Sequence, residues 1–374
     1  MSRARDFADL ASAYSGGALA NRNMIVNGAF QVDQKSETAT KTGSGGTKFT
    51  DGWRHGQSNV GQLSVEASRT ADAPSSFQGN YSCKIQVKTV ESSLGASEDL
   101  TVYTNIEGFD CAKLQYGSAN AKKTTLSFWV KSSIAGTFAC NMYMADGNMA
   151  IAQPYTISSA DTWEYKTLIW AGNTSQAITI DNTPGLQIQW FISIGSNSTG
   201  GSNGDSWHTY TGNEDKWAFG HTTNTHVTTD ESTFQLTGVQ FEIGDVATNY
   251  EHLPYDAEFA KCQRYYHRLQ PTGAWTRFAV GQHRTTTDAE TYYEHPVEMR
   301  AVPSVGTTGT ASNYGIYHAN TVTTCSAVPS VSDQASTKMS VLVIAASSGL
   351  TAGRAFSLLA NNSSSTYLEF SSEL

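Results

Sequence analysis

Apolar and polar residues alternate along most of the chain beyond Met24, which is the pattern of a β-strand with one buried and one exposed face. The clearest alternating runs occupy residues 126–131, 163–170, 186–194 and 234–243. Segments rich in glycine, serine, threonine and asparagine separate these runs, as they do in sandwiches and jelly rolls. The pattern therefore predicts an all-β protein whose main domain, residues 23–254, is a β-sandwich or jelly roll.

The first segment of the chain has a helical period instead. Phe7, Leu10 and Tyr14 are spaced at i, i+3 and i+7, which places them in one apolar stripe of a helix that ends at a pair of glycines. A helix of about three or four turns is not stable alone in water. We therefore expect residues 1–22 to be an anchoring helix and linker that docks on a partner or on its own copies; the alternative is a helix folded back on its own domain. The residues expected to anchor it are Arg3, Arg5, Phe7, Leu10 and Tyr14.

A short helix and a second β domain are expected after the sandwich. Tyr255, Phe259, Cys262 and Tyr266 are spaced to line one face of a helix that runs to Leu269. We interpret residues 255–272 as this linker helix. Residues 273–374 contain further alternating runs and predict a smaller C-terminal β domain.

Composition narrows the range of functions. The net charge is −9 and only 15% of the residues are charged, which argues against a nucleic-acid partner. The longest apolar run, residues 341–346, is too short to span a bilayer, and the N-terminus has no signal-peptide pattern. We therefore expect synthesis in the cytoplasm and no membrane insertion. The five cysteines have no metal-ligand spacing and predict buried, reduced side chains.

Several segments resemble a family of bacteriophage tail-fibre and head-fibre proteins that contain a jelly roll like that of carbohydrate-binding modules. The resemblance lies in residues 3–10, in residues 23–30 with the following Trp53, in residues 236–252 with the CQRYY motif at Cys262, and in residues 295–303. It covers both ends of the sandwich and the linker. The middle of the sandwich and the last seventy or so residues are poorly covered.

The resemblance implies a structural protein of the virion, made in the host cytoplasm. It implies a short homotrimeric fibre that attaches through its N-terminal segment to phage tail or capsid proteins and binds a host-surface polysaccharide. Apolar residues of the C-terminal part, such as Tyr314, Ile316 and Tyr317, are expected between subunits. A head fibre or capsid decoration protein is the alternative function, and a capsule-degrading glycosidase is a third.

Candidate glycan-binding residues are aromatic side chains beside polar ones, because a ring stacks on the C–H face of a sugar while polar groups bond its hydroxyls. Next to the glycine-rich residues 195–204, the candidates are Asp205, Trp207, His208, Tyr210, Asn213 and Trp217. The alternative is that these aromatics only pack under the loop. In the C-terminal domain the candidates are Tyr293 and Tyr317, for which the alternative is packing against a neighbouring subunit.

Signatures of catalysis are poor. No HExxH, GxSxG or phosphate-loop motif occurs, and the adjacent carboxylates Glu214 and Asp215 are interpreted as solvated loop charges rather than as a glycosidase pair. We expect a protein that is not an enzyme. No cofactor is expected either, with a structural calcium ion held by aspartates and backbone carbonyls as an alternative whose ligands the sequence does not place.

Overall fold

The computed structural model describes residues 21–200, 205–210 and 217–374. The chain divides into two compact units, the first extending through Glu258 and the second spanning Phe259–Glu373. Strands make up nearly all regular structure in both units, so the predicted all-β fold class is confirmed. Among the described residues, no helix is long and apolar enough to cross a membrane.

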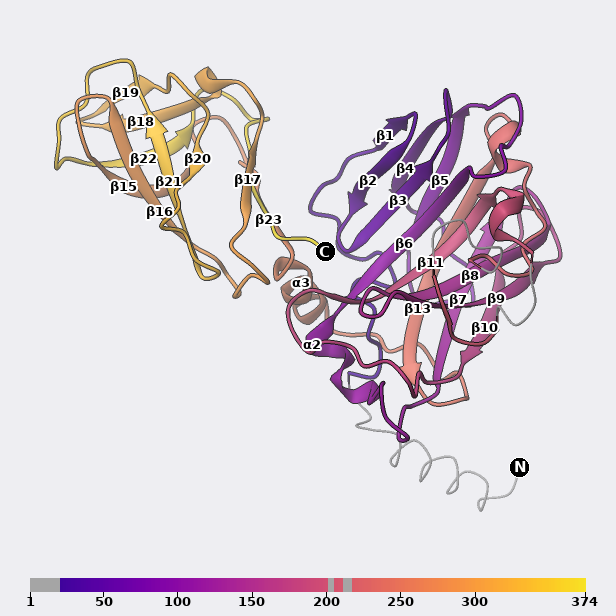
Figure 1. The fold of residues 1–374 in the computed structure, drawn as a ribbon. Helices are drawn as coiled ribbons and strands as arrows, with labels where there is room; N and C mark the ends of the chain where they lie inside the picture. Colours follow the sequence, from indigo (N-terminus) through magenta and orange to yellow (C-terminus); the bar gives the residue numbers. More distant parts are fainter. Residues whose placement is uncertain (1–20, 201–204, 211–216) are drawn as a thin grey trace. The chain divides into compact units, whose positions relative to one another are not determined.

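The first unit is a jelly-roll sandwich of two antiparallel sheets (Figure 1). One sheet has, in spatial order, β1 (Ala39–Thr42), β4 (Ser64–Thr70), β5 (Ser82–Thr89), β13 (Thr233–Ile243), β7 (Thr124–Ser132) and β10 (Glu164–Trp170). The other has β12 (His208–Thr209), β9 (Met149–Ile157), β8 (Gly136–Met144), β11 (Pro184–Ile194), β6 (Asp99–Glu107), β3 (Trp53–Ser58) and β2 (Gly45–Thr50). The chain passes repeatedly from one sheet to the other, which is the connectivity of a jelly roll.

Short helical segments complete this unit: α2 (Gly108–Cys111), η1 (Ala112–Leu114), η2 (Ser196–Ser198) and η3 (His226–Thr228). The predicted strands at residues 126–131, 163–170, 186–194 and 234–243 are confirmed as parts of β7, β10, β11 and β13.

Aromatic side chains from both sheets fill the centre of the sandwich. Trp53 of β3, Trp190 of β11 and Phe128 of β7 are fully buried. The ring centroids of Trp53 and Trp190 lie 5.7 Å apart, and those of Phe128 and Trp190 lie 5.6 Å apart at 86°. Edge-to-face contacts of this kind stabilise a core beyond the area that they bury. The core therefore joins the two sheets at residues that alternate with polar ones along each strand.

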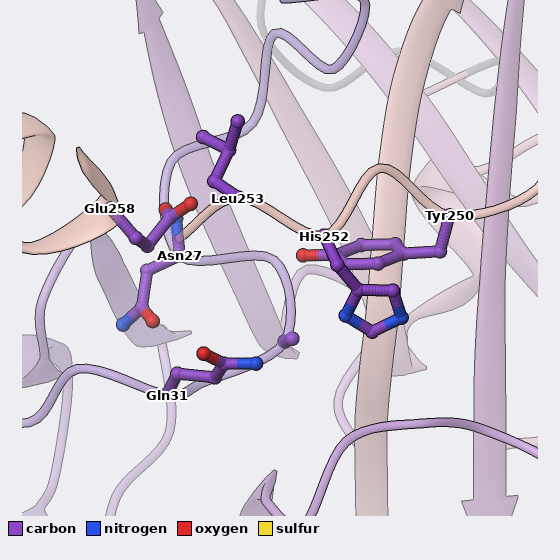
Figure 2. A pocket seen from close by; sticks show the side chains of 7 residues that line it. Asn27, Gln31, Tyr250, His252, Leu253 and Glu258 are labelled. Carbon is purple, nitrogen blue, oxygen red and sulfur yellow. The ribbon is translucent and has the colours of Figure 1, made fainter. Parts of the chain in front are cut away.

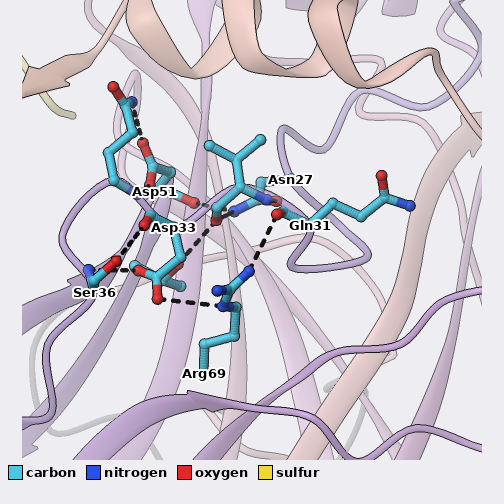
Figure 3. Close-up of polar contacts among 9 residues, drawn as sticks. Asn27, Gln31, Asp33, Ser36, Asp51 and Arg69 are labelled. Carbon is cyan, nitrogen blue, oxygen red and sulfur yellow. Dashed lines mark hydrogen bonds and ion pairs between the residues drawn. The ribbon is translucent and has the colours of Figure 1, made fainter. Parts of the chain in front are cut away.

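A network of polar contacts closes the loop before the first strand (Figure 3). The Asn27 amide donates to the carbonyls of Val32 and Asp51 at 2.8 and 3.0 Å and accepts from the Val32 N–H at 3.0 Å. Arg69 of β4 forms an ion pair with Asp33 at 3.2 Å. Asn27 has φ of +57°, a conformation that asparagine tolerates better than most residues. The Asn27 side chain therefore ties the two ends of this loop together.

The second unit also has two sheets. A three-stranded sheet contains β14 (Tyr266–Leu269), β23 (Leu368–Ser371) and β17 (Ser304–Thr307). A seven-stranded sheet contains, in order, β19 (Thr321–Thr324), β18 (Tyr314–His318), β22 (Ala355–Ala360), β15 (Arg277–His283), β16 (Asp288–Glu294), β21 (Met339–Ala345) and β20 (Ser330–Val331). A 3-10 turn, η4 (Ala311–Asn313), precedes β18.

The linker helix is shorter than predicted. α3 (Tyr255–Gln263) ends before Tyr266, and Tyr266–Leu269 form the strand β14. Tyr266 and His267 pair with β23 and are nearly buried. The helical spacing of aromatics therefore held only for the first part of the segment, because the β23 partner lies about a hundred residues away and leaves no local signal.

Two of the C-terminal residues expected between subunits are instead buried inside the second unit. Tyr314 and Ile316 of β18 are fully buried in its own core, so the expectation that they pack between subunits is wrong. The Tyr314 hydroxyl donates to the carbonyl of Tyr367. All five cysteines are buried, as predicted, and burial raises the pKa of the Cys83 thiol to about 12.

Candidate functional site

An open groove of about 550 Å³ lies over the face of the seven-stranded sandwich sheet that points away from the core. Residues of β2, β3, β6 and β11 form its floor, and Tyr210 and Trp217 line it from the segment that follows β11. Cavities of 300–1,000 Å³ are typical of sites for small ligands. The groove is therefore large enough to take several atoms of a ligand ring.

Strand alternation makes the groove floor polar. On β11, Ile188 and Trp190 face the core, whereas Gln187 and Gln189 face the groove. Gln189 pairs with Tyr103 of β6, which places the two side chains beside each other on the same face. The Gln187 amide donates to the Asn105 side chain at 3.2 Å. The floor thus presents carboxamides and a phenol in neighbouring positions.

The Tyr103 ring lies along the floor, and glycines make room for it. A Cβ atom at Gly56 of β3 would stand 3.3 Å from Tyr103 Cε1, and one at Gly46 of β2 would stand 3.5 Å from the Tyr103 hydroxyl. Gly46 and Gly56 pair directly with each other. Because both lack a side chain, the Tyr103 ring extends from β6 across β3 toward β2. An aromatic ring in this position forms part of the floor of the groove.

The wall of the groove is aromatic. The centroids of Tyr210 and Trp217 lie 4.3 Å apart at 36°. Trp217 also contacts Tyr143 edge to face at 5.2 Å, and its carbonyl accepts from Asn141 of β8 at 3.1 Å. The Tyr210 N–H donates to the carbonyl of Asn148 at 2.7 Å. These contacts to the sheet hold both rings in fixed positions beside the floor.

Gln189 and Asp99 are two polar side chains of the floor that are largely buried. Gln189 is only 9% exposed, and its Oε1 atom has no hydrogen-bond partner within the described part of the chain. At Asp99, burial raises the pKa of the carboxyl to about 6, although hydrogen bonds from the hydroxyl and N–H of Ser58 favour its charged form. Asp99 is the only charged side chain among the described residues that line the groove.

The structure separates the predicted candidates of the first unit. Tyr210 and Trp217 line the groove. Trp207 packs against the core instead: its ring meets Tyr116 edge to face at 5.8 Å, and its Nε1 donates to the carbonyl of Ala171 at 2.7 Å. Trp207 is half-buried in this position, and a role for it in glycan binding stays a prediction.

The remaining candidates are spread more widely. His208 lies in β12 and pairs with Ala150, and Asp205 is exposed beside it. Tyr293 and Tyr317 belong to the second unit, where the Tyr293 ring stacks against both His267 and Phe370, which are neighbours on paired strands. The Tyr317 ring lies under the Arg277 guanidinium at 4.7 Å. Asn213 and the anchoring candidates Arg3, Arg5, Phe7, Leu10 and Tyr14 lie outside the described residues, as do Glu214 and Asp215.

Sequence reasoning missed the other twelve residues that line the groove, among them Asp99, Tyr103, Gln187 and Gln189. A signal for the glutamines was present, because they alternate with large apolar residues in a strand whose other face is core. No such signal marked Asp99 or Tyr103, which join the site only through the pairing of β6 with β3 and β11.

A smaller pocket lies elsewhere among the described residues of the first unit. A second pocket, lined by Asn27, Gln31, Tyr250, His252 and Glu258 among others, has a volume of about 10 Å³ and accommodates about one water molecule (Figure 2). Among the residues that the structure describes, no group of three or more His, Cys, Asp or Glu side chains is placed to hold a metal ion. The groove is therefore the candidate site.

Comparisons with known proteins give only remote similarities. No family model matches the chain, and no curated protein matches it. The enzymatically active domain of bacteriophage CBA120 tailspike protein 4 is 13% identical, with 59% of this chain and 21% of that chain covered and a TM-score of 0.33. The match thus spans about a fifth of the tailspike chain.

Two carbohydrate-binding modules are similar at the same level. TmCBM61, solved with beta-1,4-galactotriose, is 12% identical over 60% of this chain and 100% of its own, with a TM-score of 0.29. The family 11 module from Clostridium thermocellum, in complex with a mixed-linked tetrasaccharide, is 11% identical over 56% and 100%, with a TM-score of 0.26. All three scores lie below 0.5, too low to transfer a ligand or an activity to this chain.

Proposed function

We propose that the groove binds a carbohydrate chain, and that the protein is a short fibre of a phage particle that binds a glycan on the host surface. The observation that carries the first part is the combination of the Tyr103 ring, which extends over Gly56 and Gly46, with the Tyr210–Trp217 wall beside a floor that contains carboxamides. Sugar rings have apolar C–H faces that stack on aromatic rings, and hydroxyls that bond amide groups. The groove offers both kinds of contact within one site.

A pair of variants tests glycan binding. Tyr103→Ala and Trp217→Ala each remove one aromatic surface, and we expect each to weaken binding to isolated host-surface polysaccharide by about tenfold or more, or about 1.4 kcal/mol. Tyr165→Ala is the matched control, because Tyr165 is 44% exposed on β10 of the other sheet. Affinity electrophoresis of the three variants measures the effect. If the groove variants bind as the control does, the groove is not the site.

The fibre role rests on the resemblance of several segments to phage fibre proteins. In this proposal residues 1–22 attach to tail or capsid proteins, and three copies present their grooves together. Linked weak sites can gain a factor of about 100 or more in avidity when the geometry lets them engage at once. If groove variants abolish polysaccharide binding but leave adsorption of the phage unchanged, the head-fibre or decoration role replaces the adhesive one.

No catalytic step is part of the proposal. Hydrolysis of a glycosidic bond ordinarily uses a pair of carboxyl groups on opposite sides of the bond. Prolonged incubation with host polysaccharide, followed by a reducing-end assay, tests this point. Release of new reducing ends that Asp99→Asn abolishes would make the protein a glycosidase.

A further inference from the structure

We infer that the groove selects uncharged glycans, and that Asp99 is the residue that excludes acidic ones. This inference rests on the proposed function, since it specifies which class of carbohydrate the groove takes. It concerns uronic acids, sulfated sugars and other anionic chains, in contrast to neutral polysaccharides.

The placement of Asp99 is the first part of the argument. Asp99 begins β6 and pairs with Ser58, the last residue of β3, so its carboxyl lies at one end of the groove floor. Alternation along β6 puts Asp99, Thr101 and Tyr103 on the same face, toward the groove. A ligand that stacks on Tyr103 and extends toward Ser58 therefore comes close to this carboxyl.

The rest of the lining is the second part. The other described lining residues are serine, threonine, glycine, asparagine, glutamine and aromatic residues, none of which carries a positive charge. The partners of the Asp99 carboxyl are the neutral donors of Ser58. An anionic sugar would thus meet a negative charge without a cation among these lining residues to offset it. At a separation of about 6 Å near a protein surface, such repulsion weakens binding by about tenfold or more.

Neutral hydroxyl groups face no such repulsion. The carboxamide of Gln189 offers both a donor and an acceptor, as a sugar hydroxyl does. Gln187 also lines the floor, whereas the Gln189 Oε1 atom is buried and has no hydrogen-bond partner within the described part of the chain. The floor is therefore suited to a chain of hydroxyls, and Asp99 can accept from one of them.

The cation nearest in sequence on the same face is outside the lining. Arg54 lies on the outward face of β3 with Gly56 and Ser58, but Gly56 separates it from Ser58. The outward face of β3 therefore has a positive charge near its start, at Arg54, and lies beside the Asp99 carboxylate at its end, at Ser58. Arg54 pairs with Tyr103 of β6 and with Lys48 of β2, and the Lys41 ammonium lies near Gly45, so an acidic group would meet cations only outside the residues that line the floor beside Asp99.

The experiment compares neutral with acidic probes. Dextran, galactan and mixed-linkage β-glucan are the neutral set, and polygalacturonate, alginate and hyaluronate are the acidic set, each measured by affinity electrophoresis at pH 7.5. We expect the full-length protein to bind within the neutral set and to bind every acidic probe at least tenfold more weakly. Asp99→Asn should narrow the difference in affinity between the neutral and the acidic probes to less than threefold.

A control separates local charge from net charge. Asp230→Asn makes the same change in net charge at an exposed loop position that does not line the groove, and it should leave the discrimination unchanged. Acidic probes bound as tightly as neutral ones by the unaltered protein would overturn the inference and leave glycan binding intact. Failure of all six probes to bind, together with unchanged host-polysaccharide binding by Tyr103→Ala, would instead overturn the proposed function of the groove.

Discussion

The buried carboxyl of Asp99 makes a quantitative prediction about stability. Burial raises its pKa from 3.8 to about 6. The difference between these values corresponds to about 3 kcal/mol when the group is fully ionised. The side chain keeps some contact with solvent in the groove, so we expect about 1–3 kcal/mol. Replacing Asp99 with asparagine removes the charge, while the side-chain oxygen can still accept from Ser58.

The direction of the change in stability with pH follows from how tightly the folded and unfolded chains bind the Asp99 proton. Between pH 3.8 and about 6 the folded protein holds the Asp99 proton more tightly than the unfolded chain does, so unfolding releases a proton. The contribution of this group to stability is therefore fully present below pH 4 and is lost as the pH rises to about 6. Asp99→Asn abolishes that loss. The variant should match the unaltered protein at pH 4 and exceed its free energy of unfolding by about 1–3 kcal/mol at pH 7.5.

Urea unfolding followed by tryptophan fluorescence measures this difference, since seven of the eight tryptophans lie in the first unit. Asp181→Asn is a control of opposite sign: hydrogen bonds from Thr183 lower the pKa of Asp181, so its removal should reduce stability at neutral pH. A difference between Asp99→Asn and the unaltered protein that is the same at pH 4 and pH 7.5 would refute the reasoning. So would a variant that is less stable at pH 7.5.

Three further predictions concern packing, assembly and attachment. Trp207→Ala should lower the free energy of unfolding by about 2–3 kcal/mol in urea titrations, because it removes the contact with Tyr116 and the hydrogen bond to Ala171. A variant that unfolds at the same urea concentration but binds glycan more weakly would contradict this prediction. Val280→Asp, at a side chain 67% exposed beside Tyr292 on β15 and β16, should convert the proposed trimer to monomers in light scattering without loss of folding. Removal of residues 1–17 should leave the sandwich folded but abolish incorporation into particles, and truncated protein recovered on virions would rule out the anchoring role.

Much of the sandwich could be predicted from the chain because its cause is local. In the run that became β11, large apolar residues and glutamines alternate, and the structure turns Ile188 and Trp190 inward and Gln189 outward. The same reasoning failed at Tyr266, where a helical spacing of aromatics continued into residues that form β14. There the partner strand β23, far along the chain, decides the conformation.

The two tryptophans among the glycan candidates show that the residues around an aromatic side chain in the sequence do not predict whether it is buried or lines a groove. Trp207 and Trp217 stand among similar polar neighbours in the sequence, yet one ring packs on the core and the other lines the groove. The difference arises from where each contacts the sheet: Trp207 meets Tyr116, whereas Trp217 lies against Tyr143 on the outer face. Neither contact is visible without the pairing of strands from distant parts of the chain.

Glycine was the signal that could have located the groove. Alternation decides which residues of a strand face outward, but a face covered by side chains is not hollow. Gly46 and Gly56 fall on outward positions of adjacent strands and pair with each other. Strand glycines often mark a place where something else approaches the backbone closely, and here the Tyr103 ring does so. A search for outward glycines paired across a predicted hairpin would have pointed to this sheet face, although only the three-dimensional pairing of β6 with β3 shows which ring fills the space.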